Sequence, residues 1–556
     1  MPFSSDAANS VINLSIVSCI TIKRLAHKSR KHRRLALALF GLAAALTFNI
    51  WIAVNLANDA PDDGKLYSQL ARNLVQNGVF SAETEAPFNP TLIRLPGYPL
   101  FLAAIYSVGG GDESVRIIQA IFSVGTAILA ALIAWNWKTG TRRRRRKAAL
   151  WTFALTAFCP FTAIFSATIL TEALTMFYLG ALTLAATYAL KAKGRISAIA
   201  YWFAAGAAAG IAVLLRPDSG LFALGIGLTL AISPFVCRPP EIAFLSRSID
   251  SALKGMVFSA AFVIILLPWT IRNEHVFGIF QPLAPAHAEM PGEFVPKGYL
   301  LWVRTWIDDS RYIGPMLWDL EEKKISIDAI PSYAFASEAE KQQVVVLLAK
   351  YNNSDPEEQA VETKPEPDDG DQPEDGDGPA DEQDDSAGES RELNLKISPE
   401  VDAGFQEIAE QRIEREPGRY YIWLPAKRAS IMWFDTHSEY YPFGGEIFPV
   451  EDLDNEKYQN IWLPLFGAVT WIYSLLAVVG SFILITKGQS RLWGLMALLL
   501  AFPRIAFFGT LENPEPRYLV ELFVVAAILG GIVLSRLRLK LGGHTVAVEF
   551  RYRSDR

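Results

Sequence analysis

The most constraining feature of this sequence is a series of long apolar runs that contain no charged residue. Residues 35–57 and 461–486 hold no Asp, Glu, Lys or Arg, and the charged residues are gathered between such runs. A helix rises 1.5 Å per residue, so about 20 residues cross a hydrocarbon core of about 30 Å. In a chain that is 51% apolar, these runs predict an all-α polytopic membrane protein rather than several soluble domains.

Basic clusters between the runs give the predicted orientation through the positive-inside rule. Seven Lys and Arg residues lie between Lys23 and Arg34, and five arginines and a lysine occupy 142–147. The first run is longer than the core of a cleavable signal peptide, so we expect it to be retained as an anchor. Ten spans place every basic cluster in the cytoplasm: 35–57, 115–137, two within 148–190, 196–215, 219–237, 254–271, 461–486, 491–509 and 518–535.

The same reading divides the chain into membrane and aqueous parts. The first span is followed by an outer loop, 58–114, that is too long for a simple connector. A much longer stretch between the seventh and eighth spans is expected outside the cell. The predicted parts are a basic cytoplasmic N-terminus (1–34), a transmembrane core (35–271), a large extracytoplasmic region (272–460), three further spans (461–535) and a cytoplasmic tail (536–556).

Charge composition excludes several classes of function. The chain has a net charge of −6, but residues 354–390 hold 16 acidic residues and one lysine, which leaves a net +9 elsewhere. This acidic segment is almost free of apolar residues, and we expect it to be disordered. The basic clusters are explained by topology, so no nucleic-acid partner is expected. Cys19, Cys159 and Cys237 are scattered, which argues against a disulfide scaffold or a zinc cluster.

The first outer loop contains the earliest candidate residues for chemistry. Apolar residues from Leu66 to Val75 recur at helical spacing and predict an amphipathic helix at the membrane surface. Asp63 stands at the start of this helix, where an acidic residue is also an ordinary N-cap. Residues 94–103, Arg-Leu-Pro-Gly-Tyr-Pro-Leu-Phe-Leu-Ala, predict a turn followed by a second short apolar helix.

Other charges lie where membrane helices are predicted to begin or end on the outer side. Charges at this depth are costly, and they usually face a polar cavity or one another. Mutual pairing and snorkelling to the interface are the structural alternatives to a functional site. Arginine suits a phosphate ligand because its planar fork donates two hydrogen bonds to adjacent oxygens. These charges are Glu172, Arg216, Asp218, Arg272, Arg504, Glu515 and Arg517.

Six stretches, in this order, together resemble a known family. They are DGKLYSQLARNLVQNGVFS (63–81), RLPGYPLFLAAIY (94–106), PFTAIFSATILTEAL (160–174), GIAVLLRPDSGL (210–221), LLPWTIRNEHVFG (266–278) and NPEPRYLVELF (513–523). The chain resembles GT-C glycosyltransferases of the glycosyltransferase family 39 group, which includes protein O-mannosyltransferases and lipid A aminoarabinose transferases. The resemblance implies a GT-C bundle of about ten spans, with juxtamembrane helices in the first outer loop.

The resemblance also implies an activity and a set of site residues. The activity is transfer of a sugar from a polyprenyl-phosphate donor to a glycan, lipid or protein acceptor on the outer side of the membrane. Asp63 maps onto the catalytic carboxylate, four residues before Tyr67, with Asp62 as a neighbouring alternative. Glu172 maps onto a second acid of the family, and Arg216 and Arg517 onto residues around the lipid phosphate. The other substrate-binding candidates are Tyr67, Arg94, Asp218, Arg272 and Glu515.

The expected reaction is a single inverting displacement, with Asp63 as general base and membrane lipids around the donor. No obligatory cofactor or metal is expected, although some GT-C enzymes use a divalent metal. The short loops and the family resemblance indicate a bacterial inner membrane, with the active site on the periplasmic side. Aromatic residues of the large outer region, namely Trp302, Trp306, Trp433 and Tyr440, are candidates for stacking on acceptor sugars or for core packing.

Two other classes of function remain open from the sequence. A transporter or flippase of a lipid-linked sugar would also have ten spans and charges at the outer ends of its helices. Inverted repeats with broken helices would favour it, but none is visible in the sequence. A non-catalytic membrane assembly or signalling protein is the second alternative. Dispersed positions of Asp63, Glu172 and Arg216 would favour that class.

Overall fold

A computed structural model describes residues 35–57, 61–137, 140–236, 243–353, 395–447, 450, 453 and 457–537. Within these ranges the chain is helical and contains no strand. The acidic segment 354–390, predicted to be disordered, lies outside the described residues, as do the N-terminus 1–34 and most of the predicted cytoplasmic tail. The chain divides into two compact units, each built from separated stretches of sequence.

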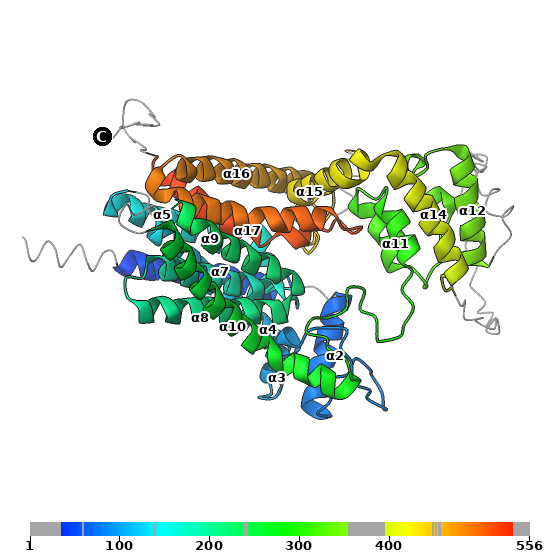
Figure 1. The fold of residues 1–556 in the computed structure, drawn as a ribbon, viewed down its shortest axis with the longest axis horizontal. Coiled ribbons are helices and arrows are strands. Elements are labelled where there is room, and N and C mark those ends of the chain that lie inside the picture. Colours follow the sequence, from blue (N-terminus) through cyan, green and yellow to red (C-terminus); the bar gives the residue numbers. More distant parts are fainter. Residues whose placement is uncertain are drawn as a thin grey trace, which may run out of the picture. The chain divides into compact units, whose positions relative to one another are not determined.

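Unit 1, which comprises residues 1–284, 438–500 and 520–556, holds most of the apolar helices. Figure 1 shows α4, α7, α8, α9 and α10 as neighbouring rods. The helices of this unit are Leu35–Asn55, α2 (Asp62–Gln76), α3 (Gly97–Tyr106), α4 (Asp112–Asn136), α5 (Arg142–Ala157), α6 (Pro160–Ala163), α7 (Glu172–Lys191), α8 (Arg195–Leu215), α9 (Gly220–Val236), α10 (Phe244–Phe277), α16 (Gln459–Ile485), the first part of α17 (Arg491–Gly509) and α18 (Leu522–Leu534).

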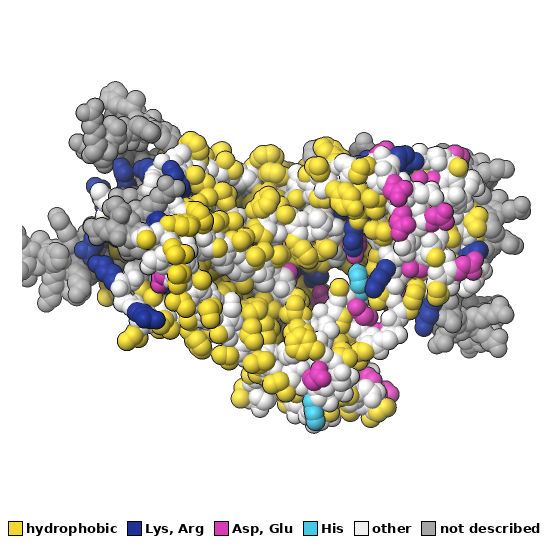
Figure 2. Space-filling view, viewed as in Figure 1, with side chains coloured by type: hydrophobic (Ala, Val, Ile, Leu, Met, Phe, Trp, Pro, Cys, Tyr) yellow, Lys and Arg dark blue, Asp and Glu magenta, His cyan; other side chains and the backbone are white. Residues whose placement is uncertain are grey.

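The prediction of an all-α polytopic membrane protein is confirmed. Eight described helices are long and apolar enough to cross a bilayer, or nine if the bent pair formed by α5 and residues 160–166 counts as one span. Hydrophobic side chains cover much of the outer surface of these helices (Figure 2). Exposed large hydrophobic residues on α10 and α16 include Leu253, Val263, Ile271, Trp471, Leu475, Val478 and Phe482.

The predicted count of ten spans is not confirmed, and two spans account for the difference. The third is broken by a 57° bend between Arg142–Ala157 and Pro160–Ser166. The tenth is reduced to α18, which has 13 residues because Pro516–Leu519 form a separate 3-10 turn. A 13-residue helix is about 20 Å long, shorter than the hydrocarbon core of about 30 Å.

Basic side chains gather at one end of unit 1, where α5 begins (Figure 2). This end carries the arginine run at the start of α5, whose N-cap Thr141 side chain accepts from the backbone N–H of Arg144. One basic end is the pattern that the positive-inside rule requires of the cytoplasmic side. The cytoplasmic assignment itself stays a prediction.

Unit 2 comprises residues 285–437 and 501–519. Its main helices are α11 (Lys297–Arg304), α12 (Glu338–Asn352), α14 (Pro399–Arg415) and α15 (Leu424–Phe434), with a π-helical turn at Arg419–Trp423 and the 3-10 turn at Pro516–Leu519. One apolar core joins α11, α12 and α14, and it contains Trp302 and Trp306 with no exposed surface. These two tryptophans are therefore core residues.

Two arginines, of which Arg428 is buried, stabilise the end of α11 within unit 2. Arg428 donates to the carbonyl oxygens of Ile307 and Arg304, at 2.6 Å each, and so satisfies acceptors that the helix end leaves open. The Arg304 guanidinium in turn forms two hydrogen bonds to Glu512, at 2.7 and 2.9 Å. These contacts join residues 285–437 to residues 501–519 in one folded unit.

Candidate functional site

The first outer loop folds into the two helices that the sequence predicts, and they pack against each other. The Tyr67 ring on α2 meets the edge of the Tyr98 ring on α3, with centroids 5.2 Å apart. Asn73 on α2 donates to the carbonyl oxygens of Ser81 and Glu83, which holds the chain that follows the helix. The loop is thus ordered, and we call α2, α3 and the chain between them the platform.

Asp63 forms an ion pair with Arg94 across this platform. Its Oδ1 lies 2.9 Å from Arg94 Nη2, and both side chains are a little over one-quarter exposed. The N-cap position of α2 is occupied by Pro61, and Asp63 lies in the first turn of the helix. Asp63 is therefore not the N-cap. Its neighbour Asp62 is exposed and pairs with Lys65 at 3.0 Å.

A second cluster of charges surrounds Arg216, directly after α8. Arg216 Nη1 lies 2.5 Å from Glu172 Oε1 and 3.5 Å from Glu521 Oε1, and its Nε lies 3.1 Å from Asp218 Oδ1. Glu172 and Glu521 are almost completely buried, and Asp218 retains 13% side-chain exposure. Three carboxylates share one guanidinium in a largely dehydrated position.

Side chains of α4 hold the bend that brings Glu172 to this cluster. Gln119 donates to the carbonyl oxygens of Phe165 and Thr168, and Arg116 Nε donates to that of Ala167. These bonds satisfy backbone groups that leave the regular helix between α6 and α7. The first residue of α7 is Glu172, so the bend fixes the position of its carboxylate.

The two charged clusters lie close together around Tyr67. The pKa of the Tyr67 phenol is raised to about 12, first by burial and then by the charge of Asp63, while Glu172 also raises it and Arg94 and Arg216 lower it. Asp63, Glu172 and Arg216 are thus gathered and not dispersed, contrary to what the assembly-protein alternative favours.

Close packing of α3 on α8 supports the same grouping. A Cβ at Gly97 would lie 2.5 Å from the carbonyl oxygen of Leu214, so only glycine allows this approach. Gly97 follows Arg94 by three residues, and Leu214 precedes Arg216 by two. One apolar cluster includes Ala71 of α2, Tyr98 of α3 and Leu215, the residue before Arg216.

The remaining predicted residues have other partners in the structure. Arg272 on α10 donates to the Thr91 carbonyl oxygen at 2.8 Å and lies over the Trp269 ring, which anchors the first loop. Glu515 and Arg517 pair with each other in unit 2. Arg504, also in unit 2, is buried and donates to the Tyr518 carbonyl oxygen at 2.7 Å.

Sequence reasoning missed Glu521 as a member of the Arg216 cluster. The residue lies within the matched stretch NPEPRYLVELF, inside the predicted tenth span. A lone acid inside a predicted span was the signal that could have identified it, because such residues usually face a polar interior.

No metal centre is evident among the described residues. Nowhere in them do three or more His, Cys, Asp or Glu side chains form a group that could hold a metal ion. The acids around Arg216 converge on its guanidinium. Independence from metal stays a prediction.

Comparisons with known proteins bear on the family. Residues 71–279 match the family described as dolichyl-phosphate-mannose-protein mannosyltransferase. The match confirms the predicted family resemblance for these residues, which include Arg94, Glu172, Arg216, Asp218 and Arg272; Asp63 and Tyr67 precede it.

Among solved structures, the chain is similar to ArnT from Cupriavidus metallidurans bound to undecaprenyl phosphate. The likeness covers 90% of this chain and 78% of that chain, at 12% sequence identity and a TM-score of 0.36. The comparison with curated proteins found no match.

Proposed function

We propose that this protein is an integral-membrane glycosyltransferase of the GT-C type, which moves a sugar from a polyprenyl-phosphate donor to an acceptor hydroxyl. The observation that carries the proposal is the grouping of Asp63–Arg94 and the Arg216 cluster around Tyr67. The family match over residues 71–279 supports the same class of reaction. The acceptor is a glycan, a lipid or a protein.

Asp63 is the general base of the proposed reaction. Its carboxylate takes the proton of the acceptor hydroxyl while the hydroxyl oxygen bonds to the anomeric carbon. The bond from that carbon to the phosphate oxygen breaks on the opposite face, and the polyprenyl phosphate leaves with the electron pair. One displacement inverts the anomeric centre. General-base assistance contributes about 10²–10⁴-fold to such a step.

The environments of the two arginines suggest different roles. Arg216 is already engaged by three acidic side chains, so its guanidinium is committed to these partners and not to a lipid phosphate. Among the described residues Arg94 forms an ion pair with one carboxylate, that of Asp63, and it is partly exposed. We assign the leaving phosphate to Arg94: donor binding draws its guanidinium away from Asp63, which frees the base. Arg216 positions Glu172 and Asp218.

The experiment that tests the function compares Asp63→Asn with wild type and Asp62→Asn. Purified proteins are incubated with polyprenyl-phosphate-linked mannose, glucose, aminoarabinose, galacturonate or arabinose and with a membrane extract that supplies glycan, lipid and protein acceptors. Transfer of the radiolabelled sugar from the donor is followed. Asp63→Asn should lose about 10²–10⁴-fold in rate for the donor that wild type consumes. Asp62→Asn should stay near wild type, because Asp62 is exposed and pairs only locally with Lys65.

Other outcomes would reject parts of the proposal. Equal rates for wild type and a folded Asp63→Asn protein would move the base to another carboxylate, with Glu172 the next to test. No consumption of any donor by wild type would favour the transporter, which moves a lipid-linked sugar without chemistry. Transport of the same lipids in vesicles would then be the measurement.

We place the protein in a bacterial inner membrane, with the reaction on the periplasmic side. The basic end of unit 1 (Figure 2) supports a cytoplasmic location for that end of the bundle. In the sequence, a basic cluster precedes the helix Leu35–Asn55 and Asp63 follows it, so the positive-inside rule assigns Asp63 to the outer side. Labelling of a cysteine introduced in the first outer loop by an impermeant reagent checks the side.

A further inference from the structure

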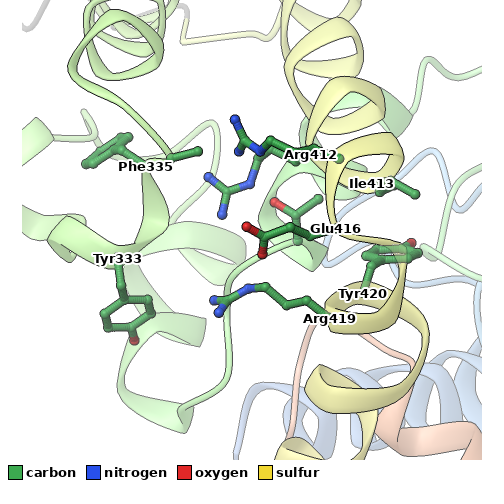
Figure 3. Close-up of a pocket in the computed structure, with 10 residues that line it drawn as sticks. Tyr333, Phe335, Arg412, Ile413, Glu416, Arg419 and Tyr420 are labelled. Atoms are coloured by element: carbon green, nitrogen blue, oxygen red, sulfur yellow. The ribbon is translucent and has the colours of Figure 1, made fainter.

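Unit 2 contains a cavity of about 180 Å³ that the proposed transfer reaction does not use. It lies between the end of α14, the following turn at Arg419–Trp423 and the segment 333–336, all within unit 2 (Figure 3). Its volume is below the roughly 300–1,000 Å³ of sites for drug-sized ligands, so it fits a single small ring. The lining residues include Tyr333, Phe335, Arg412, Arg415, Glu416, Arg419 and Tyr420.

Three arginines give the cavity a surplus of positive charge. Arg412 Nη1 lies 2.5 Å from Glu340 Oε1 and also donates to the Ala334 carbonyl oxygen. Arg415 Nη2 lies 3.9 Å from Glu340 Oε2. Burial lowers the pKa of Arg412, and the nearby charges of Arg419 and Arg415 lower it further, against the effect of Glu340. Like charges crowded around a hollow favour an anion.

Arg419 is the arginine that is available to a ligand. Among the described residues its side chain makes no ion pair with an acid, and its charge acts on Arg412 within the same cavity. Figure 3 shows the Arg419 side chain extending from its turn into the space below Glu416. A planar guanidinium in this position can donate two parallel hydrogen bonds to a carboxylate.

The other lining groups are of the types that bind a sugar ring. The Glu416 carboxylate lies between Arg412 and Arg419 in Figure 3, where it can accept hydrogen bonds from hydroxyl groups. Tyr333, Phe335 and Tyr420 supply aromatic surface around the same space. A bare inorganic anion would use the arginines but neither the rings nor Glu416.

We propose that this cavity binds an acidic sugar unit, a single pyranose ring that carries a carboxylate. Arg419, with Arg415 and Arg412 beside it, binds the carboxylate. Glu416 accepts from the ring hydroxyls, and the aromatic side chains cover the ring. The proposal concerns binding in unit 2 and stands or falls independently of the transfer reaction.

Ligand-observed NMR titrations of the purified full-length protein in neutral detergent test the proposal. Glucuronate and glucose form a matched pair that differs only at C6. Glucuronate should bind wild type about 10- to 100-fold more tightly than glucose, the range of a hydrogen bond to a charged group. Arg419→Gln should weaken glucuronate binding at least about tenfold, because it removes the charged donor to the carboxylate. Among the described residues the Arg419 side chain forms no ion pair with an acid, so the substitution should leave unit 2 folded.

Arg311→Gln is the matched control, because it removes an exposed arginine of unit 2 that does not line the cavity. It should leave glucuronate binding unchanged. Equal binding of the two sugars, no binding of either, or an unchanged affinity in Arg419→Gln would overturn the proposal. Inorganic phosphate that displaces glucuronate at equal concentration would also overturn it, because it would show a plain anion site.

Discussion

At the scale of single residues, Arg216 carries the charge balance of the candidate site. It lies between the buried acids Glu172 and Glu521 and the less buried Asp218. Buried carboxylates without a cation are strongly unfavourable, because their lost hydration is no longer offset by an opposite charge. The cluster therefore depends far more on its one arginine than on any one acid.

We expect Arg216→Gln to lower the free energy of unfolding by about 3–5 kcal/mol, the range for removing one partner of a buried pair. Glu521→Gln should cost much less, because Arg216 keeps Glu172 and Asp218 as partners. Thermal unfolding of both variants in detergent, followed by tryptophan fluorescence, measures the difference. Equal losses would mean that the guanidinium is not the centre of the cluster.

The sequence predicted which charged residues lie at the outer ends of membrane helices, but it could not predict their partners. Glu172, Arg216 and Asp218 were identified by their positions at helix ends, and pairing among them was one of the alternatives. Asp63 and Arg94 were identified in separate motifs, 31 residues apart, and only the packing of α2 on α3 brings them together. Sequence separation does not predict an ion pair of this kind, because the 31-residue segment between the two side chains can take many paths.

At the scale of elements, α8 and α10 pack through small residues. Gly206 and Gly210, four residues apart, form a GxxxG pattern on α8. A Cβ on Gly206 would lie 2.1 Å from the carbonyl oxygen of Phe258 and 2.9 Å from the Ala261 Cβ. Small residues let membrane helices approach closely, and the resulting packing replaces the hydrophobic drive that lipid does not supply.

Gly206→Ala should destabilise the protein by up to about 2 kcal/mol, since overpacking costs about 1–3 kcal/mol and alanine regains roughly 1 kcal/mol in helix propensity. Gly227→Ala on α9 is the matched control, because a Cβ there meets nothing within 4 Å. Unfolding midpoints in detergent should fall for the first variant and hold or rise for the second. Unfolding midpoints that fall in both variants, or rise in both, would contradict the packing argument.

Most elements were predictable from composition, and the exceptions have tertiary causes. The ninth span was predicted at 491–509 and α17 occupies Arg491–Gly509, because charge and apolar length define both ends. The break between α5 and α7 depends on Gln119 and Arg116 of α4, which bind the backbone of the bend. A run of apolar residues does not reveal such distant donors.

At the scale of the whole molecule, the acidic segment is inserted between neighbouring helices of unit 2. Lys350, near the end of α12, lies 2.7 Å from Glu400 in the first turn of α14. Val344, Leu348, Val401 and Phe405 on the two helices share one core. The helices on either side of the insertion therefore contact each other, and described residues on both of them form the shared core.

Replacing residues 356–392 with about ten Gly and Ser residues should leave unit 2 folded. Loop-closure entropy changes by only about 0.6 kcal/mol for each twofold change in length, so a small gain in stability is expected. Purified yield and the unfolding midpoint of the shortened chain provide the measurement. Aggregation or a large loss of stability would show that the segment takes part in folding.

Unit 2 is built from two stretches that are far apart in the sequence, 285–437 and 501–519, and this has a consequence for biosynthesis. Arg304 and its partner Glu512 are 208 residues apart, and both belong to this unit. A ribosome adds about 5–20 residues per second, so Glu512 is made roughly 10–40 seconds after Arg304. For that interval the nascent chain carries a guanidinium whose carboxylate does not yet exist, and unit 2 can close only when the last membrane helices are being synthesised.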